Sequence, residues 1–397
     1  MDILKEKHQK KVAGTSLGFI RSMMDHIDWT QRLIGIRGAR GVGKTTLMLQ
    51  YIARYHADDP LVLYASLDDF YFSQNRLAEV AGQFAREGGR RLFLDEVHKY
   101  PDWSRELKNI YDDIPELKVV FTGSSLLEII NARADLSRRA VVYSMQGLSY
   151  REYLGLAREV HLPAFSLEDI LTKTTEITRM INGKIKPLQH FSHYLTTGYY
   201  PFFIESELLY HMRVAEVVNM IIEMELPLLR GVDVAYIRRL KQLMLIIAQS
   251  APFVPNISKL SERIGINRNT LISYLGYLQE AGLTRNLYKD ASGITLLQKP
   301  EKIFPENTNL AGALTNNAPE TGNVRETFFA NQVGFNHELT YPETGDFLVN
   351  DQFLFEVGGK RKGKRQIKET LNGYVAADDS EYGFDNKIPL WLFGFLY

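Results

Sequence analysis

Cysteine is absent from the 397 residues of the sequence. Its absence excludes disulfides, thiolate zinc sites and cysteine nucleophiles, and it fits a reducing compartment. Net charge is absent as well, because 47 Lys and Arg residues balance 47 Asp and Glu residues. Any surface for nucleic acid or membrane therefore has to come from local clustering of charge.

Long apolar segments are also missing. Residues 1–11 contain no apolar stretch of the kind found in signal peptides. The longest dense apolar run, residues 243–248, is far too short to cross a bilayer. We therefore expect a soluble cytoplasmic protein with no membrane partner. The length predicts about two to four domains, and 45% hydrophobic with 24% charged residues is an ordinary globular composition.

Short apolar runs alternate with helical patterns in the first 150 residues. The runs cover residues 33–36, 61–65, 92–95, 119–122 and 140–143, and segments such as 45–55 and 76–86 lie between them. Buried strands that alternate with helices predict an α/β fold built on a parallel sheet. In such sheets ligands bind at the carboxyl ends of the strands.

The first apolar run leads into the glycine-rich segment GARGVGKTT, residues 38–46, which fits the pattern G-x-x-x-x-G-K-[ST]. Backbone N–H groups of such a loop wrap around phosphates, and the following helix adds a favourable dipole. Lys44 is expected to reach the β- and γ-phosphates, and the Thr45 hydroxyl to ligate Mg²⁺. The alternative is a glycine turn before an ordinary helix. The predicted nucleotide-binding positions are Gly38, Ala39, Arg40, Gly41, Val42, Gly43, Lys44, Thr45 and Thr46.

Polar residues end the third and fourth apolar runs. Asp95 is predicted to hold the Mg²⁺ shell, and Glu96 to polarise the attacking water. The alternative for Glu96 is a surface position at the start of a loop. Thr122 or Ser124 would face the γ-phosphate from the neighbouring strand, and a helix N-cap at Ser124 or Ser125 is the competing interpretation.

Two arginines, Arg138 and Arg139, precede the fifth run. An arginine near a γ-phosphate stabilises the charge of the transition state, either in cis or from a neighbouring subunit, which would require an oligomer. Solvated surface arginines are the alternative.

These motifs, together with LSYREY at 148–153, resemble the AAA-type ATPases of the archaeal-ATPase-like group. Proteins of this group carry a C-terminal domain of unknown function related to restriction endonucleases. The resemblance implies ATP as the nucleotide, and it favours Arg139 over Arg138 because the family's arginine usually follows a glycine. It also implies an α/β P-loop NTPase core at 1–155, a helical lid or linker at 156–235, a winged-helix module at 236–305 and a restriction-endonuclease-like α/β domain at 306–397.

Residues 258–282 predict a helix, a turn at Gly265 and a second helix that Asn267 caps. Segments 283–288 and 294–297 are expected to pair as a wing. The second helix offers Arg268 and Asn269 for contact with DNA. A module that only packs beside the core is the other interpretation.

The last domain contains Glu326, Asp346 and Glu356 in the order of the endonuclease pattern, in which three acids surround a metal. The lysine of that pattern is missing, because position 358 is Gly. We expect a degenerate nuclease, or one that uses Lys360 by a shift. The segment Lys360–Lys368 carries six basic residues, which would contact phosphates or form a solvated loop.

The sequence thus predicts a Mg²⁺-dependent ATPase switch that acts on DNA or on a protein partner. An ATP-regulated, metal-dependent nuclease and a nucleotide-gated binding protein with negligible turnover are the alternatives.

Overall fold

A computed structural model describes the chain except for residues 124–130, 132, 251, 290–298, 316–319 and 363–371. The chain folds as two compact units, Met1–Gly147 and Leu148–Tyr397. The segments that the sequence divides into helical, helix-turn-helix and C-terminal parts all lie within the second unit.

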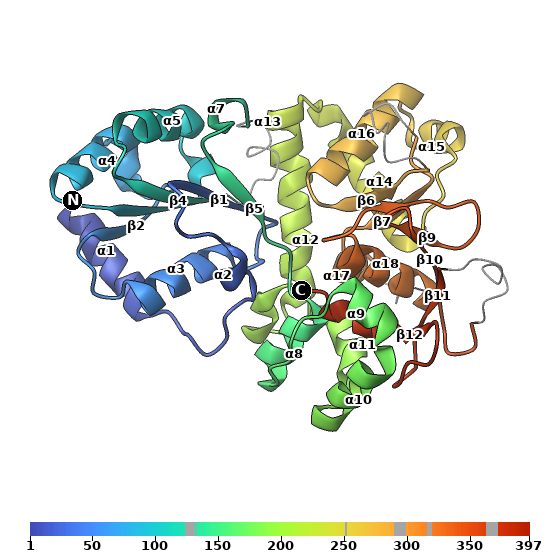
Figure 1. Cartoon of the computed structure of the whole chain (residues 1–397). Helices are drawn as coiled ribbons and strands as arrows, with labels where there is room; N and C mark the ends of the chain where they lie inside the picture. Colours follow the sequence, from blue (N-terminus) through green and yellow to red (C-terminus); the bar gives the residue numbers. More distant parts are fainter. Residues whose placement is uncertain (124–130, 132, 251, 290–298, 316–319, 363–371) are drawn as a thin grey trace. The chain divides into compact units, whose positions relative to one another are not determined.

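The first unit contains a five-stranded parallel sheet in the order β2-β3-β4-β1-β5 (Figure 1). Each predicted apolar run forms a strand. β4 lies between β1, which leads into the glycine loop, and β3, which ends in the acidic pair. The strands are β1 Leu33–Arg37, β2 Val62–Ser66, β3 Arg91–Asp95, β4 Lys118–Gly123 and β5 Val141–Ser144.

Helices surround this sheet, and the two helical segments predicted between strands are confirmed as α3 and α4. The helices are α1 Asp2–Ala13, α2 Met23–His26, α3 Lys44–Tyr55, η1 Phe70–Ser73, α4 Leu77–Arg86, η2 Val97–Lys99, α5 Trp103–Asp113 and α7 Arg133–Leu136.

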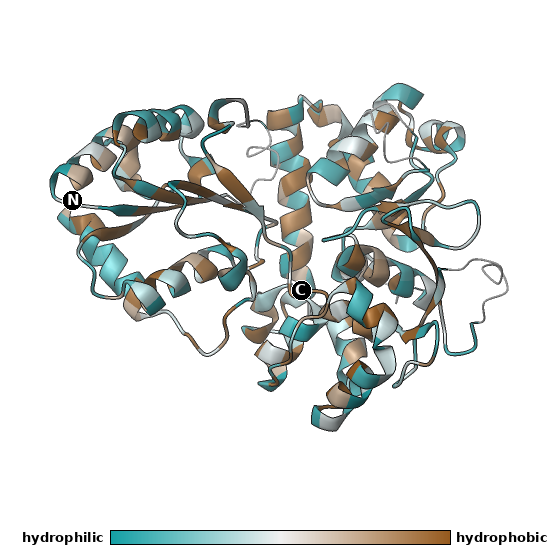
Figure 2. Cartoon of the chain, in the orientation of Figure 1, coloured by the Kyte–Doolittle hydropathy of each residue, from teal (hydrophilic) through white to brown (hydrophobic). Residues whose placement is uncertain are grey.

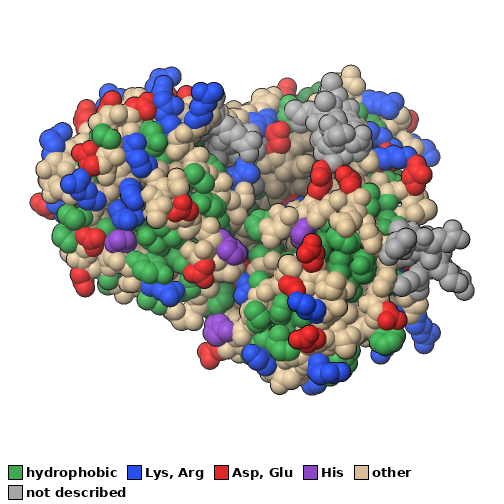
Figure 3. All heavy atoms as spheres, in the orientation of Figure 1, with side chains coloured by type: hydrophobic (Ala, Val, Ile, Leu, Met, Phe, Trp, Pro, Cys, Tyr) green, Lys and Arg blue, Asp and Glu red, His purple; other side chains and the backbone are tan. Residues whose placement is uncertain are grey.

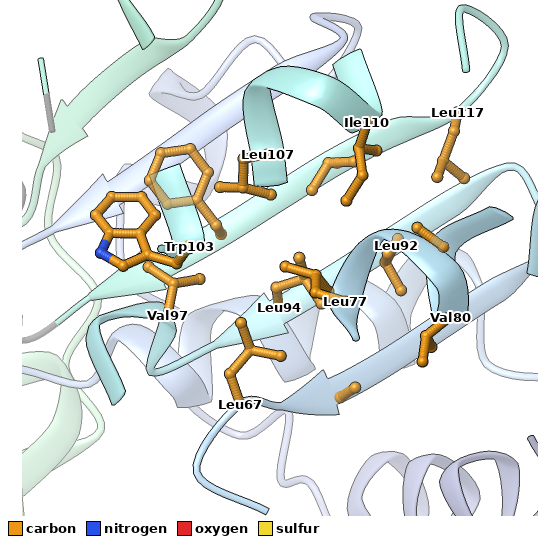
Figure 4. Packing of buried hydrophobic residues seen from close by; sticks show 14 of the residues in the cluster. Leu67, Leu77, Val80, Leu92, Leu94, Val97, Trp103, Leu107, Ile110 and Leu117 are labelled. Carbon is orange, nitrogen blue, oxygen red and sulfur yellow. The ribbon is translucent and has the colours of Figure 1, made fainter. Parts of the chain in front are cut away.

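β1, β2, β3 and β4 are buried on both faces, as parallel strands usually are, and much of this sheet is brown, and therefore hydrophobic, in Figure 2; β5 at the edge is mostly exposed. Figure 4 shows Leu77 of α4 and Leu107 of α5 directed toward Leu94 of β3. Trp103 of α5 adds an aromatic contact, with its ring 5.6 Å from that of Phe121. This packing fixes the carboxyl ends of β3 and β4, where the acidic pair and Thr122 lie.

The second unit begins with helices, as expected for the helical lid or linker at 156–235. They are α8 Tyr150–Arg158, α9 Leu167–Thr172, α10 Thr174–Lys184, α11 Leu188–Thr197, η3 Pro201–Ile204, α12 Tyr210–Met220, the π-helix η4 Ile221–Glu225, α13 Leu226–Arg230, η5 Val234–Tyr236 and α14 Ile237–Ser250.

Two further helices, α15 (Ile257–Ile264) and α16 (Arg268–Glu280), are separated by a turn at Gly265. Asn267 accepts a hydrogen bond from the Thr270 N–H at 2.9 Å, so the predicted cap is confirmed. β6 (Thr284–Leu287) follows and pairs antiparallel with β7 (Lys302–Pro305). The pairing partner thus comes later in the chain than the predicted 294–297, and 294–297 itself lies outside the described residues.

The C-terminal part has a mixed five-stranded sheet in the order β12-β11-β10-β9-β8. Phe329 of α18 anchors this helix to the sheet, since its ring lies 5.0 Å from those of Phe347 and Phe355. The elements are α17 Thr308–Leu314, α18 Thr321–Val333, β8 Leu339–Thr340, β9 Phe347–Val349, β10 Phe353–Gly358, β11 Gly373–Ala377, β12 Lys387–Pro389 and η6 Leu390–Phe395.

No helix within the described ranges is both long and apolar enough to span a membrane. Figure 3 shows acidic and basic side chains interspersed on the visible face of each unit, in keeping with the balanced charge of the sequence.

Candidate functional site

The glycine loop joins β1 to α3, and its backbone geometry depends on its glycines. Gly43 has φ 99°, a left-handed conformation that residues with a side chain rarely adopt. At Gly38 a Cβ atom would lie 2.2 Å from the carbonyl oxygen of Met145, so no side chain fits there. The loop is therefore packed against the chain that follows β5, with the N-terminus of α3 directly behind it.

Lys44 is the first residue of α3, and its side chain is buried. Its ammonium donates hydrogen bonds to the carbonyl oxygens of Gly38 at 2.8 Å and Ala39 at 2.9 Å. The charge is thus held above the loop whose N–H groups are expected to face phosphates. Thr45 follows on the partly exposed side of the first helical turn, and Thr46 is exposed.

Arg21 fixes the glycine loop to the segment after β5, and it was not among the residues predicted from the sequence. Its buried guanidinium donates hydrogen bonds, each of 2.9 Å, to the carbonyl oxygens of Val42, Gln146 and Gly147. This single side chain links the loop to the segment after β5. No motif marks Arg21, because its partners are backbone carbonyls distant in sequence.

Asp95, at the end of β3, is 3% exposed and held by two neutral hydroxyl groups. Tyr64 of β2 donates to its Oδ2 at 3.0 Å, and Thr122 of β4 donates to its Oδ1. Burial, and then the charge of Asp95, raise the pKa of the Tyr64 hydroxyl, so it remains a donor at physiological pH. The carboxylate of Asp95 is oriented from both neighbouring strands.

Glu96 has φ 54°, a left-handed conformation that costs a non-glycine residue about 1–3 kcal/mol. Its Oε2 lies 3.3 Å from Nε2 of His98, and that nitrogen lies 3.4 Å from an Arg40 guanidinium nitrogen. Burial, with help from Arg40, Lys99 and Lys44, lowers the pKa of His98 to about 4, so the ring is neutral at pH 7. A neutral Nε2 cannot donate to Glu96 and accept from Arg40 at once, so it serves one partner at a time.

Thr122, one of two candidates for facing a γ-phosphate, is fully buried and bonds Asp95 while accepting from the Glu96 N–H at 3.4 Å. It orients the acidic pair. Ser124 and Ser125 lie outside the described residues.

The two candidate arginines lie at the amino end of β5. Arg139 makes a bidentate ion pair with Asp112 of α5, with both N–O distances 2.9 Å. Val141, which begins β5, pairs with Ile34 near the start of β1, whereas the glycine loop follows the other end of β1. Arg139 is thus placed at the sheet edge opposite its own loop, and Arg138 is exposed.

Comparisons with known proteins agree with this geometry. Residues 30–154 match the family model described as "AAA domain". This part of the chain is therefore similar to AAA-type P-loop domains, and the name AAA domain is used for it in that sense. The resemblance to AAA-type ATPases is therefore confirmed for the domain that carries Lys44, Asp95 and Glu96. A second model, "Domain of unknown function (DUF8612)", matches residues 188–321 and assigns no activity to them.

Whole-chain comparisons give the following relatives. The uncharacterized protein MJ1637 of Methanocaldococcus jannaschii is 26% identical over an alignment of 420 positions, gaps included. The alignment covers 98% of this chain and 85% of that protein. The Walker-type ATPase PABY2304 of Pyrococcus abyssi is 13% identical with a TM-score of 0.42, over 78% of this chain and 95% of that one. AMPPCP-bound DnaA of Aquifex aeolicus is 15% identical with a TM-score of 0.26, over 65% and 84%. TM-scores this low transfer no property to the AAA domain or to the second unit.

The second unit brings Glu326 of α18, Asp346 before β9 and Glu356 of β10 together, but lysines separate them. Lys302 of β7 lies 3.2 Å from Glu326 and 3.7 Å from Asp346. Lys362 lies 4.0 Å from Asp346 and 3.8 Å from Glu356. Within the described ranges, no group of three or more His, Asp or Glu side chains is placed to hold a metal ion. The predicted three-carboxylate metal site is therefore not formed in this arrangement.

The expected shift of the missing lysine to Lys360 is also wrong in position. Lys360 is exposed, its carbonyl accepts from Lys387, and Lys362 is the residue that reaches the acids. Most of the basic segment Lys360–Lys368, from residue 363 onward, lies outside the described residues.

Proposed function

We propose that the protein is a Mg²⁺-dependent ATP-binding and ATP-hydrolysing switch whose second unit couples nucleotide state to DNA or to a protein partner. The observation that carries the proposal is the sheet order. β4 alone separates the loop with Lys44 from the tip of β3 with Asp95 and Glu96, so phosphate-binding and acidic groups share one sheet edge.

The assigned roles follow from this geometry. Lys44 and the loop N–H groups bind the phosphates, and Thr45 with Asp95 holds Mg²⁺, the cation that carboxylate and hydroxyl oxygens suit. Mg²⁺ would neutralise charge on the phosphates. Glu96, once released from His98, orients the attacking water. Arg139 would stabilise the transition state of a neighbouring subunit, since its own loop lies beyond the opposite ends of the strands.

DNA is the partner we propose for the α15–α16 pair with its β6–β7 hairpin, a winged-helix arrangement. Leu271, Leu275 and Leu278 are buried, while Arg268 and Asn269 are exposed at the start of α16, where a recognition helix contacts bases. Two further basic residues are less suited. Arg285 is bonded to Gly334 and Glu306, and Lys289 pairs with Glu343.

The test is steady-state ATP hydrolysis in Mg²⁺ with and without duplex DNA, with Glu96→Gln measured beside the wild type. We expect Glu96→Gln to bind ATP normally and to lose turnover. Wild-type turnover no higher than that of Glu96→Gln would overturn the ATPase and leave a nucleotide-gated binding protein.

Stimulation by DNA should fall steeply with salt, because phosphate contacts release counterions. It should also be lost in the double variant Arg268→Ala/Asn269→Ala and kept in Arg179→Ala, an exposed arginine of α10. If the ATP hydrolysis rate is the same with and without DNA at every salt concentration, DNA is excluded and a protein partner takes its place in the proposal.

A further inference from the structure

The acidic cluster of the second unit, formed by Glu326, Asp346 and Glu356, is largely buried and contains the ammonium group of Lys302, while the 34% exposed side chain of Lys362 reaches it from the side. The Lys302 side chain is 10% exposed, and the acids that it contacts are 15% and 16% exposed. An ammonium taken this far out of water is costly unless carboxylates compensate it. Lys302 is therefore an integral part of the cluster.

Lys302 occupies the place between two acids that a metal ion would need. Its Nζ atom contacts Glu326 Oε2 and Asp346 Oδ1 at once, at 3.2 and 3.7 Å. Asp346 is fixed in turn, because its Oδ2 accepts from the Val357 N–H at 2.8 Å. The same oxygens cannot ligate a divalent cation and pair with an ammonium in this position.

Lys362 lies between Asp346 and Glu356, and its side chain reaches them across Gly358. A Cβ atom at Gly358 would lie 2.9 Å from three carbons of the Lys362 side chain. The lack of a side chain at position 358 thus gives the Lys362 stem its path. The ammonium arrives 4.0 Å from Asp346 and 3.8 Å from Glu356.

One carboxylate oxygen remains unsatisfied. Glu356 is 1% exposed, and within the described parts of the chain its Oε1 has no hydrogen-bond partner. Three carboxylates against two ammoniums also leave an excess of acidic groups. Removal of one ammonium would leave three acids against one cation, so the attraction of the cluster for a divalent cation would rise.

We propose that Lys302 and Lys362 are built-in cations that replace a divalent metal in this cluster. Lys302 blocks the position between Glu326 and Asp346. The cluster holds the C-terminal sheet to α18 and β7 as a metal-free ionic centre, and removal of the Lys302 ammonium exposes a site for a hard divalent cation.

The experiment measures Mn²⁺ binding by calorimetry to the nucleotide-free full chain. Mn²⁺ prefers the same oxygen ligands as Mg²⁺. The wild type should bind no Mn²⁺ at this cluster, so Asp346→Asn should leave the Mn²⁺ binding of the chain unchanged. Lys302→Met should gain an Mn²⁺ site and a rise in melting temperature on Mn²⁺ addition, and Lys302→Met/Asp346→Asn should lose both. Lys289→Met, which removes an exposed lysine of the same unit, should behave as the wild type.

Two results would overturn the proposal. The first is Mn²⁺ binding by the wild type that Asp346→Asn abolishes. The second is a folded Lys302→Met chain that binds no more Mn²⁺ than the wild type. If Lys302→Met does not fold, Lys302→Gln takes its place with the same expected gain, because it also removes the charge while keeping polar contact with the acids.

Discussion

The AAA domain and the C-terminal sheet both hold buried carboxylates, but with different partners. Asp95 is oriented by the neutral hydroxyls of Tyr64 and Thr122. Asp346, by contrast, lies within 4.0 Å of the ammoniums of Lys302 and Lys362. A neutral donor fixes a carboxylate and leaves its charge in place, whereas an ammonium cancels the charge. The first arrangement suits the Mg²⁺ role that we propose for Asp95, and the second suits the structural role that we propose for Asp346.

The basic groups of the two units differ in the same way. Lys44 donates hydrogen bonds to the uncharged carbonyl oxygens of Gly38 and Ala39 in the glycine loop. The ammonium of Lys302, by contrast, forms ion pairs with the carboxylates of Glu326 and Asp346.

The largest effect is expected from Lys302→Met on stability. Breaking a buried ion pair by removing one partner costs about 3–5 kcal/mol, because buried charges remain uncompensated. The free energy of unfolding in urea should fall by that amount, whereas Lys289→Met should change it by less than about 0.5 kcal/mol. Equal midpoints for the two variants would show that Lys302 is not integral to the cluster.

Lys44→Ala should abolish ATP binding in calorimetry. Charge-assisted hydrogen bonds contribute about 1.5–3 kcal/mol each, so losing two phosphate contacts weakens binding by roughly 100-fold or more. Lys10→Ala, which removes an exposed lysine of α1 in the same unit, should keep the wild-type affinity. Normal ATP affinity in Lys44→Ala would refute the phosphate site.

Tyr64→Phe should have an intermediate effect. It removes one donor to a buried carboxylate, which costs about 1.5–3 kcal/mol of stability. ATP turnover should fall about tenfold and recover in part at high Mg²⁺, because Asp95 is less well oriented for the metal. Tyr71→Phe in η1 is the matched control. If high Mg²⁺ does not restore any ATP turnover in Tyr64→Phe, Tyr64 contributes to packing and does not orient Asp95 for the metal.

The smallest effect concerns pH. Burial raises the pKa of the Glu326 carboxyl, Lys302 opposes this, and Asp346 adds to it. The native state thus holds this proton more tightly than the unfolded chain, whose value is near 4.5. The resulting stabilisation is complete below that pH and is lost as pH rises through the raised pKa.

Glu326→Gln removes this titration. The stability of Glu326→Gln relative to the wild type should therefore increase between about pH 4.5 and pH 8 in urea melts. Glu320→Gln, at the exposed start of the same helix, should not show the trend. A constant difference between Glu326→Gln and the wild type would contradict the cause given for the shift.

Local patterns predicted the first unit well. The glycine loop and the tip of β3 are each defined by neighbouring residues, so the positions of Lys44 and Asp95 followed from the sequence. Arg21 and Tyr64 did not, because they reach the site from elements distant in sequence. Their contacts exist only once the sheet order is known.

The second unit shows the limit of matching residues to a pattern. Glu326, Asp346 and Glu356 were predicted to surround a metal from their resemblance to the endonuclease pattern, and the structure brings them together around Lys302 and Lys362. Lys302 lies on β7, a strand that was expected elsewhere in the chain. Gly358 stands where the endonuclease pattern has its lysine. Its lack of a side chain leaves room for the Lys362 side chain. Whether an acid is free depends on neighbours that the acidic pattern does not contain.

The last residues bear on the order in which the chain folds during synthesis. The Tyr397 carbonyl accepts hydrogen bonds from Ser149 and Arg151 at the start of α8, and η6 is buried among the elements of the second unit. A ribosome therefore releases the AAA domain's residues long before the second unit can close. During synthesis from the N-terminus, the nucleotide domain would fold first, and the second unit would fold after η6 and Tyr397 are made.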